Sequence, residues 1–423
     1  MGRGGLVDSM LRAGSRAWRL VTPAPLRGLA QPVMAALAEF RVLSIVAPPE
    51  REFRPGALVV SGFFSESRGI SQAARLTVAG LTAAGFTPVQ HDLRDVIAAG
   101  PGARKKLPSD PGGVWITHVN APEAMHALGY LDPASWRGRY RIGFWVWELE
   151  LIPAAWVRAS RVFHEIWVPS RFVADAMTAS GVTTPIRVMP HPVALGAPPK
   201  RNRPAFELAE DDFIVLSMGD LRSSLTRKNL LGAVAIYRCA FPEPVPGRSM
   251  IVKVQSTDPH PAIDAAVSAA IAGRPDITLL ADSLSTVDAQ SLIASADVFL
   301  SPHRSEGFGL PLAEAFMAGV PALATGWSGN LDFMGEVPKL LIRNTLVPVS
   351  DPHGIYKGEY QGQGQRWAEP DLDDAAQTLR RLAEFPDLRA DLAARGRKAV
   401  EAQATAWSRE ALAATELARL TAK

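Results

Sequence analysis

Two runs of alternating strand-like and helix-like segments constrain the fold of this chain more than any other feature. In the first run, strand-like segments lie at 57–64, 113–119, 141–147, 165–170 and 186–190, with a helical segment at 70–85. The pattern breaks at 191–212, where proline, glycine and charged residues are dense. It restarts with strand-like segments at 213–220, 249–254, 277–282, 297–302 and 321–325 and ends in helical sequence. Apolar strands interleaved with helices are typical of parallel sheets covered on both faces.

The chain therefore belongs to the α/β class and is expected to form two domains. Its 423 residues suffice for two separate cores. We expect a basic amino-terminal segment at 1–50, one domain at 51–195, a linker at 196–204, a second domain at 205–400 and a last segment at 401–423. Ligands of such sheets bind at the carboxyl ends of the strands. The cleft between the two halves is therefore the expected site.

The composition narrows the class of protein. A net charge of +3, with 47% hydrophobic and 21% charged residues, does not predict a nucleic-acid partner. No apolar run approaches the roughly 18–20 residues of a membrane span. One cysteine, Cys239, excludes an internal disulfide, and with no secretory signal this predicts a cytoplasmic protein.

The first 30 residues combine apolar positions near a helical period with several arginines. One interpretation is an interfacial helix that contacts anionic lipid at the inner face of the cell membrane. The alternative is a loosely docked terminal helix.

The stretch SEGFGLPLAEA, at 305–315, follows the strand-like segment at 297–302. Gly307 and Gly309 permit close approach of a ligand to the backbone, and the loop leads into a helix whose amino terminus suits a phosphate. Glu306 in the loop and Glu314 in the helix can flank one extended ligand, because carboxylates accept hydrogen bonds from vicinal hydroxyls. Two carboxylates at this spacing are common by chance, but the strand, loop and helix around them favour a functional site.

A second motif, GDLRSSLTRKN at 219–229, lies between the first strand of the second half and its helix. Cations at this position would stabilise a diphosphate leaving group. Lys228 is the first candidate and Arg222 the second, whereas Arg227 is expected to face solvent. The alternative is a solvated basic loop.

With these motifs the chain resembles the retaining glycosyltransferases of the GT-B fold, family four. The resemblance rests on the E-x7-E element at 306–314, on RKN at 227–229 and on WAEPDLDDAAQTLRRL at 367–382. In the first half, GFFSESRGISQAAR, FWVWELE and IWVPSRFVADAM resemble a bacterial subgroup more loosely. The resemblance to family four implies two Rossmann-like domains that face a central cleft, with the last helix packed back on the first domain.

The resemblance also implies roles for the motif residues. Glu306 would hold donor-sugar hydroxyls, Glu314 would bind the ribose, and Lys228 with Arg222 would neutralise the diphosphate. The remaining donor contacts would come from Gly307, Phe308, Gly309 and Leu310, with Leu284 beside the base. No cofactor or metal is expected, since the nucleotide-diphosphate sugar is itself the donor substrate and the scattered histidines lack ligand spacing.

Four residues of the first half are further candidates. Gly69 lies at the first strand-to-helix turn, where the family has a glycine-rich loop near the donor phosphates; the alternative is an ordinary turn. Either His118 or Asn120 would hold the position of a family histidine that touches the donor sugar, and a core or capping role is the alternative. Glu148, after the strand at 141–147, would contact acceptor or donor. Trp145 and Trp147 are expected to be core residues.

The predicted function is transfer of a hexosyl unit, with retention, from a nucleotide-diphosphate sugar to a glycan or lipid-linked acceptor. Rival interpretations are an epimerase or phosphorylase of the same fold, and a non-catalytic sensor or scaffold that binds sugar nucleotides. The intact Glu306, Glu314 and Lys228 favour the enzyme. The sequence does not name the sugar, base, acceptor, linkage or oligomeric state.

Overall fold

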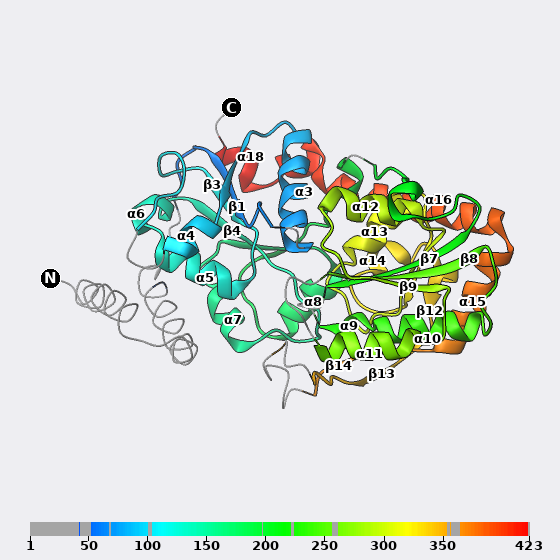
Figure 1. Cartoon of the computed structure of the whole chain (residues 1–423). Helices are drawn as coiled ribbons and strands as arrows, with labels where there is room; N and C mark the ends of the chain where they lie inside the picture. The colour runs from blue at the N-terminus through cyan, green and yellow to red at the C-terminus, as the bar shows by residue number, and fades with distance from the viewer. Residues whose placement is uncertain are drawn as a thin grey trace.

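A computed structural model describes residues 42, 52–66, 69–99, 104–196, 198–220, 224–255, 261–352, 356 and 364–421 (Figure 1). The amino-terminal helix expected at 1–30 lies outside the described residues, as does Arg222. Among the helices that are described, none has the length and apolar character needed to cross a membrane.

The first half is built on a six-stranded sheet in the order β2-β1-β3-β4-β5-β6, with every neighbouring pair parallel. Its strands are β1 (Leu58–Gly62), β2 (Pro88–Asp92), β3 (Val114–Thr117), β4 (Tyr140–Phe144), β5 (Glu165–Val168) and β6 (Ile186–Val188). Its helices are α3 (Gly69–Ala83), α4 (Arg94–Ala99), α5 (Ala121–Tyr130), α6 (Pro133–Trp136), α7 (Ala154–Ser160) and α8 (Arg171–Ala179). The sequence did not predict β2, a partly exposed edge strand whose PVQHD has little apolar character.

The second half repeats the design with the order β12-β11-β10-β7-β8-β9, again with parallel neighbours. Its strands are β7 (Phe213–Asp220), β8 (Arg248–Gln255), β9 (Ile277–Leu280), β10 (Val298–Ser301), β11 (Ala322–Thr325) and β12 (Leu341–Ile342). Its helices are α9 (Leu225–Lys228), α10 (Leu230–Ala240), α11 (Pro261–Ile271), α12 (Thr286–Ser295), α13 (Leu310–Met317), α14 (Leu331–Met334), α15 (Leu372–Glu384) and α16 (Pro386–Gln403). The predicted pair of parallel α/β sheets is confirmed.

An antiparallel hairpin that the sequence did not predict joins the second half to the first. It consists of β13 (Asn344–Pro348) and β14 (Arg366–Pro370), near the boundary between the halves in Figure 1. Trp367 on β14 is 1% exposed and belongs to the same core cluster as Trp145 and Trp147. The hairpin therefore extends the core of the first half, and the two tryptophans are core residues as expected.

The chain crosses between the halves twice. The first crossing, after β6, contains the short 3-10 helices η1 (Val193–Leu195) and η2 (Arg203–Phe206). The second follows α16 and ends in α17 (Arg409–Ala413) and α18 (Glu416–Leu420), drawn in red beside the first sheet in Figure 1. Trp407 and Leu420 lie in one buried cluster with Leu58 of β1, and the Gly56 amide donates to the Leu420 carbonyl at 2.9 Å.

Candidate active site

The loop between β10 and α13 lies against the first half. A Cβ at Gly307 would come within 2.6 Å of Val146 Cγ1 and 2.8 Å of the Trp147 carbonyl oxygen. The Ser170 hydroxyl donates to the Gly307 carbonyl at 2.6 Å. Glycine is therefore required here because the backbone of the first half approaches the loop.

The last residues of this loop determine where α13 begins. Gly309 has φ +90 at the helix N-cap, a conformation that favours glycine. The Phe308 side chain is 2% exposed and packs its ring against those of His191 and Phe333. Leu310 begins the helix and packs on the core of the second half. Any ligand contact by Phe308 must therefore come from its backbone.

Glu306 lies at the centre of a cluster of opposite charges. Its Oε1 is 2.5 Å from Lys228 Nζ and 3.2 Å from Arg227 Nη1. Its amide donates to the Ser328 hydroxyl at 2.7 Å. Burial alone would raise the pKa of this carboxyl, but Lys228 and Arg227 outweigh burial and lower its pKa to about 2. Glu306 is therefore ionised at neutral pH and is unsuited to donate a proton.

The basic motif supplies two cations, and the sequence judged one of them wrongly. Arg227 was expected to face solvent but is 2% exposed, because its guanidinium donates to the Ser305 carbonyl at 2.8 Å and pairs with Glu306. Burial opposes its charge, yet nearby Glu148, Tyr356 and Glu306 raise its pKa overall. Lys228 is the last residue of the single turn of α9, and α10 begins two residues later at Leu230.

Glu148 connects this cluster to the first half. Its Oε1 lies 3.5 Å from Arg227 Nη2, and its carbonyl accepts a hydrogen bond from the Ser305 hydroxyl. The arginine is thus held between carboxylates from both halves, Glu148 and Glu306. Glu148 was predicted to contact a substrate; in this structure its carboxylate contacts Arg227.

Glu314 lies on α13 in different surroundings. It is 7% exposed, and its Oε1 accepts a hydrogen bond from Gln290 Nε2 at 2.8 Å. Burial raises the pKa of this carboxyl to about 7, although the Gln290 bond acts in the opposite direction. A small cavity of about 110 Å³ adjoins it, lined from both halves by residues that include Gln72 and Gln290. The two glutamates of the motif therefore differ in charge partners and in protonation.

The two rival positions at the end of β3 have different environments. His118 is fully buried and stacks on Phe144, with ring centroids 4.2 Å apart. Neither of its ring nitrogens has a hydrogen-bond partner among the residues that the structure describes. Burial, then nearby His191, lowers the pKa of His118 well below its usual value. The side chain of Asn120 instead accepts from the Val146 amide at 2.9 Å, which fixes the chain after β4.

The last two candidates, Gly69 and Leu284, lie near the starts of α3 and α12. Gly69 is the exposed first residue of α3, and a Cβ there would meet no atom within 4 Å, so lack of space does not require glycine. Leu284, before α12, packs its side chain against the core of the second half. Nearby, Arg75 of α3 donates to the Thr286 hydroxyl of α12 at 3.1 Å, which joins the two halves.

Two residues that the sequence did not predict, Ser328 and Tyr356, also belong to the surroundings of the candidate site. Ser328 has φ +78, and its hydroxyl accepts from the Glu306 amide. The only sequence signal for it is the small-residue turn after β11, GWSGN. Tyr356 packs its ring edge-on to Trp147 at 5.8 Å, and nothing in its local sequence indicates this place. Within the described ranges, no group of three or more acidic, histidine or cysteine side chains could hold a metal.

Comparison with known proteins decides the family. The family described as "Family 4 Glycosyltransferase in conflict systems" matches residues 169–413, more than half of the chain. This chain belongs to glycosyltransferase family 4. It is also 27% identical over 192 residues to the MMP alpha-(1->4)-mannosyltransferase of Mycolicibacterium hassiacum, covering 42% of this chain and 44% of the relative. The match thus spans less than half the length of this curated relative.

Solved structures establish the fold of this family 4 member. Sucrose-phosphate synthase from Thermosynechococcus elongatus superposes with a TM-score of 0.57 at 16% identity, covering 86% of this chain and 98% of that one. The trehalose-6-phosphate synthase OtsA gives a TM-score of 0.57 at 13% identity over 86% and 99%. WaaG, a glycosyltransferase of lipopolysaccharide biosynthesis, gives 0.51 at 12% over 86% and 97%. The expected GT-B fold and family are confirmed.

Proposed function

We propose that this family 4 member transfers a hexosyl unit, with retention, from a nucleotide-diphosphate sugar to a glycan or lipid-linked acceptor. The observation that carries the proposal is the clamp on Glu306, whose carboxylate contacts both Lys228 and Arg227 beside the glycine loop. A buried carboxylate and a lysine at one point suit a ligand that presents sugar hydroxyls and a diphosphate together.

In this proposal Lys228 exchanges part of its contact with Glu306 for the diphosphate. A cation at the leaving oxygen stabilises the charge that develops as the glycosidic bond breaks. The pKa of about 2 keeps Glu306 ionised, so it orients hydroxyls and moves no proton. The acceptor oxygen then bonds to the anomeric carbon on the face that the diphosphate leaves, and the departing phosphate oxygen takes the proton of that acceptor hydroxyl. The enzyme works mainly by positioning.

Glu314 is proposed to bind the ribose. A carboxylate that accepts hydrogen bonds from two vicinal hydroxyls gains more as an anion than as a neutral acid. Binding therefore favours loss of the proton that burial holds on this residue near neutral pH. Gln72 of α3 and Gln290 of α12 line the same small cavity as Glu314 and would contact the same ligand.

The names of the relatives suggest which sugar donors to test first. One relative is named a mannosyltransferase, and one fold relative, HepE of Anabaena, was solved with UDP and glucose. We therefore propose a hexosyl donor and would compare mannosyl and glucosyl nucleotides first.

The test is a thermal-shift screen of nucleotide sugars, followed by measurement of nucleoside diphosphate release with and without acceptors. A donor that stabilises the protein and is turned over, with activity lost in Glu306→Gln, is the expected result. Stabilisation without turnover across all acceptors would favour the non-catalytic sensor. If no nucleotide sugar bound, the proposal would be wrong.

A further inference from the structure

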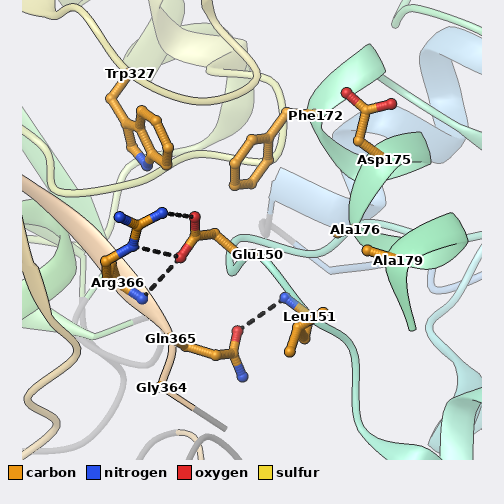
Figure 2. Close-up of a pocket in the computed structure, with 10 residues that line it drawn as sticks. All are labelled: Glu150, Leu151, Phe172, Asp175, Ala176, Ala179, Trp327, Gly364, Gln365 and Arg366. Carbon is orange, nitrogen blue, oxygen red and sulfur yellow. Dashed lines mark hydrogen bonds and ion pairs between the residues drawn. The ribbon is translucent and has the colours of Figure 1, made fainter.

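A second cavity, larger than the one beside Glu314, lies between the two halves. Its volume is about 510 Å³, within the roughly 300–1,000 Å³ of small-molecule sites. The first half contributes Glu150 after β4 and Phe172, Asp175 and Ala179 of α8. The second half contributes Trp327 after β11 and Arg366 of β14. We call these six residues the aromatic pocket (Figure 2).

We propose that the aromatic pocket binds a neutral sugar ring of a glycan acceptor, as a subsite separate from the donor loop. This inference rests on the proposed function, because it assigns the class of acceptor to the same enzyme. The chemistry of the pocket and its connection through the backbone to the Glu306 cluster carry it.

The apolar surface comes from one ring of each half. The Phe172 and Trp327 ring centroids are 5.8 Å apart, and the ring planes are inclined by 73°. Both side chains are only partly buried, and Figure 2 shows the rings side by side above the Glu150–Arg366 pair. Pyranose rings have apolar C–H faces and polar edges, so two inclined aromatic rings offer a corner for such a face.

The polar surface is a fixed ion pair across the boundary. Arg366 Nη2 lies 3.0 Å from Glu150 Oε1, and the Arg366 amide donates to Glu150 Oε2 at 2.9 Å. Each group can form further hydrogen bonds with a ligand, because a carboxylate accepts several hydrogen bonds and a guanidinium donates five. The arginine side chain is 52% exposed and the glutamate 26%, so both can reach hydroxyls of a ligand. Mutual neutralisation of the pair favours a neutral ligand over an anion.

A further donor is present on the indole. Trp327 Nε1 has no hydrogen-bond partner within the described part of the chain. Figure 2 shows this nitrogen on the side of the ring that faces Arg366. A ligand hydroxyl, with a small shift of the ring, would satisfy a donor that is costly to leave unpaired.

The backbone connects this pocket to the candidate active site. Trp327 directly precedes Ser328, whose hydroxyl accepts from the Glu306 amide. Glu150 lies two residues beyond Glu148, which pairs with Arg227. The cavity beside Glu314 has a different set of lining residues. One cavity can therefore hold a nucleotide while the other holds part of a glycan.

The test uses the whole protein and three neutral probes, mannohexaose, maltohexaose and cellohexaose, titrated by calorimetry. Wild type should bind at least one of them. Trp327→Ala removes one wall of the corner, and Ala179→Trp fills the pocket from an exposed position on α8. Trp327→Ala should weaken binding by up to about tenfold, because a stacking ring is lost. Ala179→Trp should weaken binding at least as much, because the added ring occupies the space of the ligand. Phe385→Ala, which deletes an exposed ring outside the pocket, is the matched control and should bind as wild type.

Nucleoside diphosphate binding, followed by thermal shift, separates this inference from the proposed function. We expect both pocket variants to keep it. If wild type bound nucleoside diphosphate but none of the hexasaccharides, the pocket assignment would be overturned. The same holds if Ala179→Trp bound the hexasaccharide as wild type does. Hexasaccharide binding without any nucleotide binding would retain the pocket and refute the proposed donor site.

Discussion

Lys228 Nζ and Glu306 Oε1 are 2.5 Å apart, so the cation proposed for the diphosphate contacts the carboxylate proposed for the sugar. The two residues lie 78 positions apart in the chain. Strands β7 and β10 are direct neighbours in the sheet, and the segments that follow them carry the pair to the same edge. This contact gives the first prediction.

Glu306→Gln should lower turnover by about 10²–10³-fold while leaving nucleoside diphosphate affinity nearly unchanged. The amide keeps the shape but loses the charge that orients donor hydroxyls in the transition state. Steady-state kinetics and calorimetric titration separate the two quantities. Glu336→Gln, at an exposed position of the same half, should behave as wild type. A parallel loss of affinity and turnover would contradict the sugar assignment.

Glu314→Gln should weaken nucleoside diphosphate binding by about tenfold or more, because hydrogen bonds to a carboxylate contribute about 1.5–3 kcal/mol. The affinity of wild type should also fall as the pH drops through about 7, where Glu314 gains a proton. The variant should lose the part of this pH dependence that Glu314 causes and keep the part that comes from the terminal phosphate, whose second pKa is about 6. Titrations at several pH values test both points, and unchanged affinity in the variant would refute the ribose assignment.

The same variant should increase stability at high pH. The pKa of Glu314 is raised from 4.5 when unfolded to about 7 when folded. Its contribution to stability is therefore fully present below about pH 4.5 and is lost as the pH rises through about 7. Glu314→Gln should raise the free energy of unfolding by about 1–3 kcal/mol at pH 8 relative to its effect at pH 5. Denaturant unfolding at pH 5 and pH 8 measures this difference. If the substitution changed the free energy of unfolding equally at both pH values, burial of the ionised Glu314 would not destabilise the protein.

Arg227→Met should destabilise the protein by about 3–5 kcal/mol, because it removes the buried cation that Glu148 and Glu306 share and leaves Glu306 with Lys228 alone. Arg171→Met is the matched control, since Arg171 also pairs with a carboxylate of the other half, at Asp332, but its side chain is 73% exposed. The control should cost about 0–1 kcal/mol.

Denaturant melts of both arginine variants provide the measurement. Similar losses of stability in the two variants would mean that burial does not decide how much the Arg227 contacts stabilise the protein.

Much of the fold could be predicted because its cause is local. Apolar strands such as FIVLSMGD became β7 over the whole predicted range, 213–220. The helix that follows the glycine loop was also predicted, and Gly309 adopts a positive φ directly before α13. The edge strand β2 and the hairpin β13–β14 were missed, since their polar sequences gain their pairing from neighbours distant in the chain.

In the candidate site, too, some features could be predicted from the sequence and others could not. The sequence alone brought out Glu306, Glu314 and Lys228, because a glycine loop between strand and helix and a basic loop before a helix carry recognisable spacing. Only the tertiary structure decided their environments. Arg227 is buried because Glu148 and Glu306 approach it from opposite halves, and Glu314 has a raised pKa because the packing around α13 excludes water. Burial and charge pairing depend on contacts between distant segments, which local spacing does not encode.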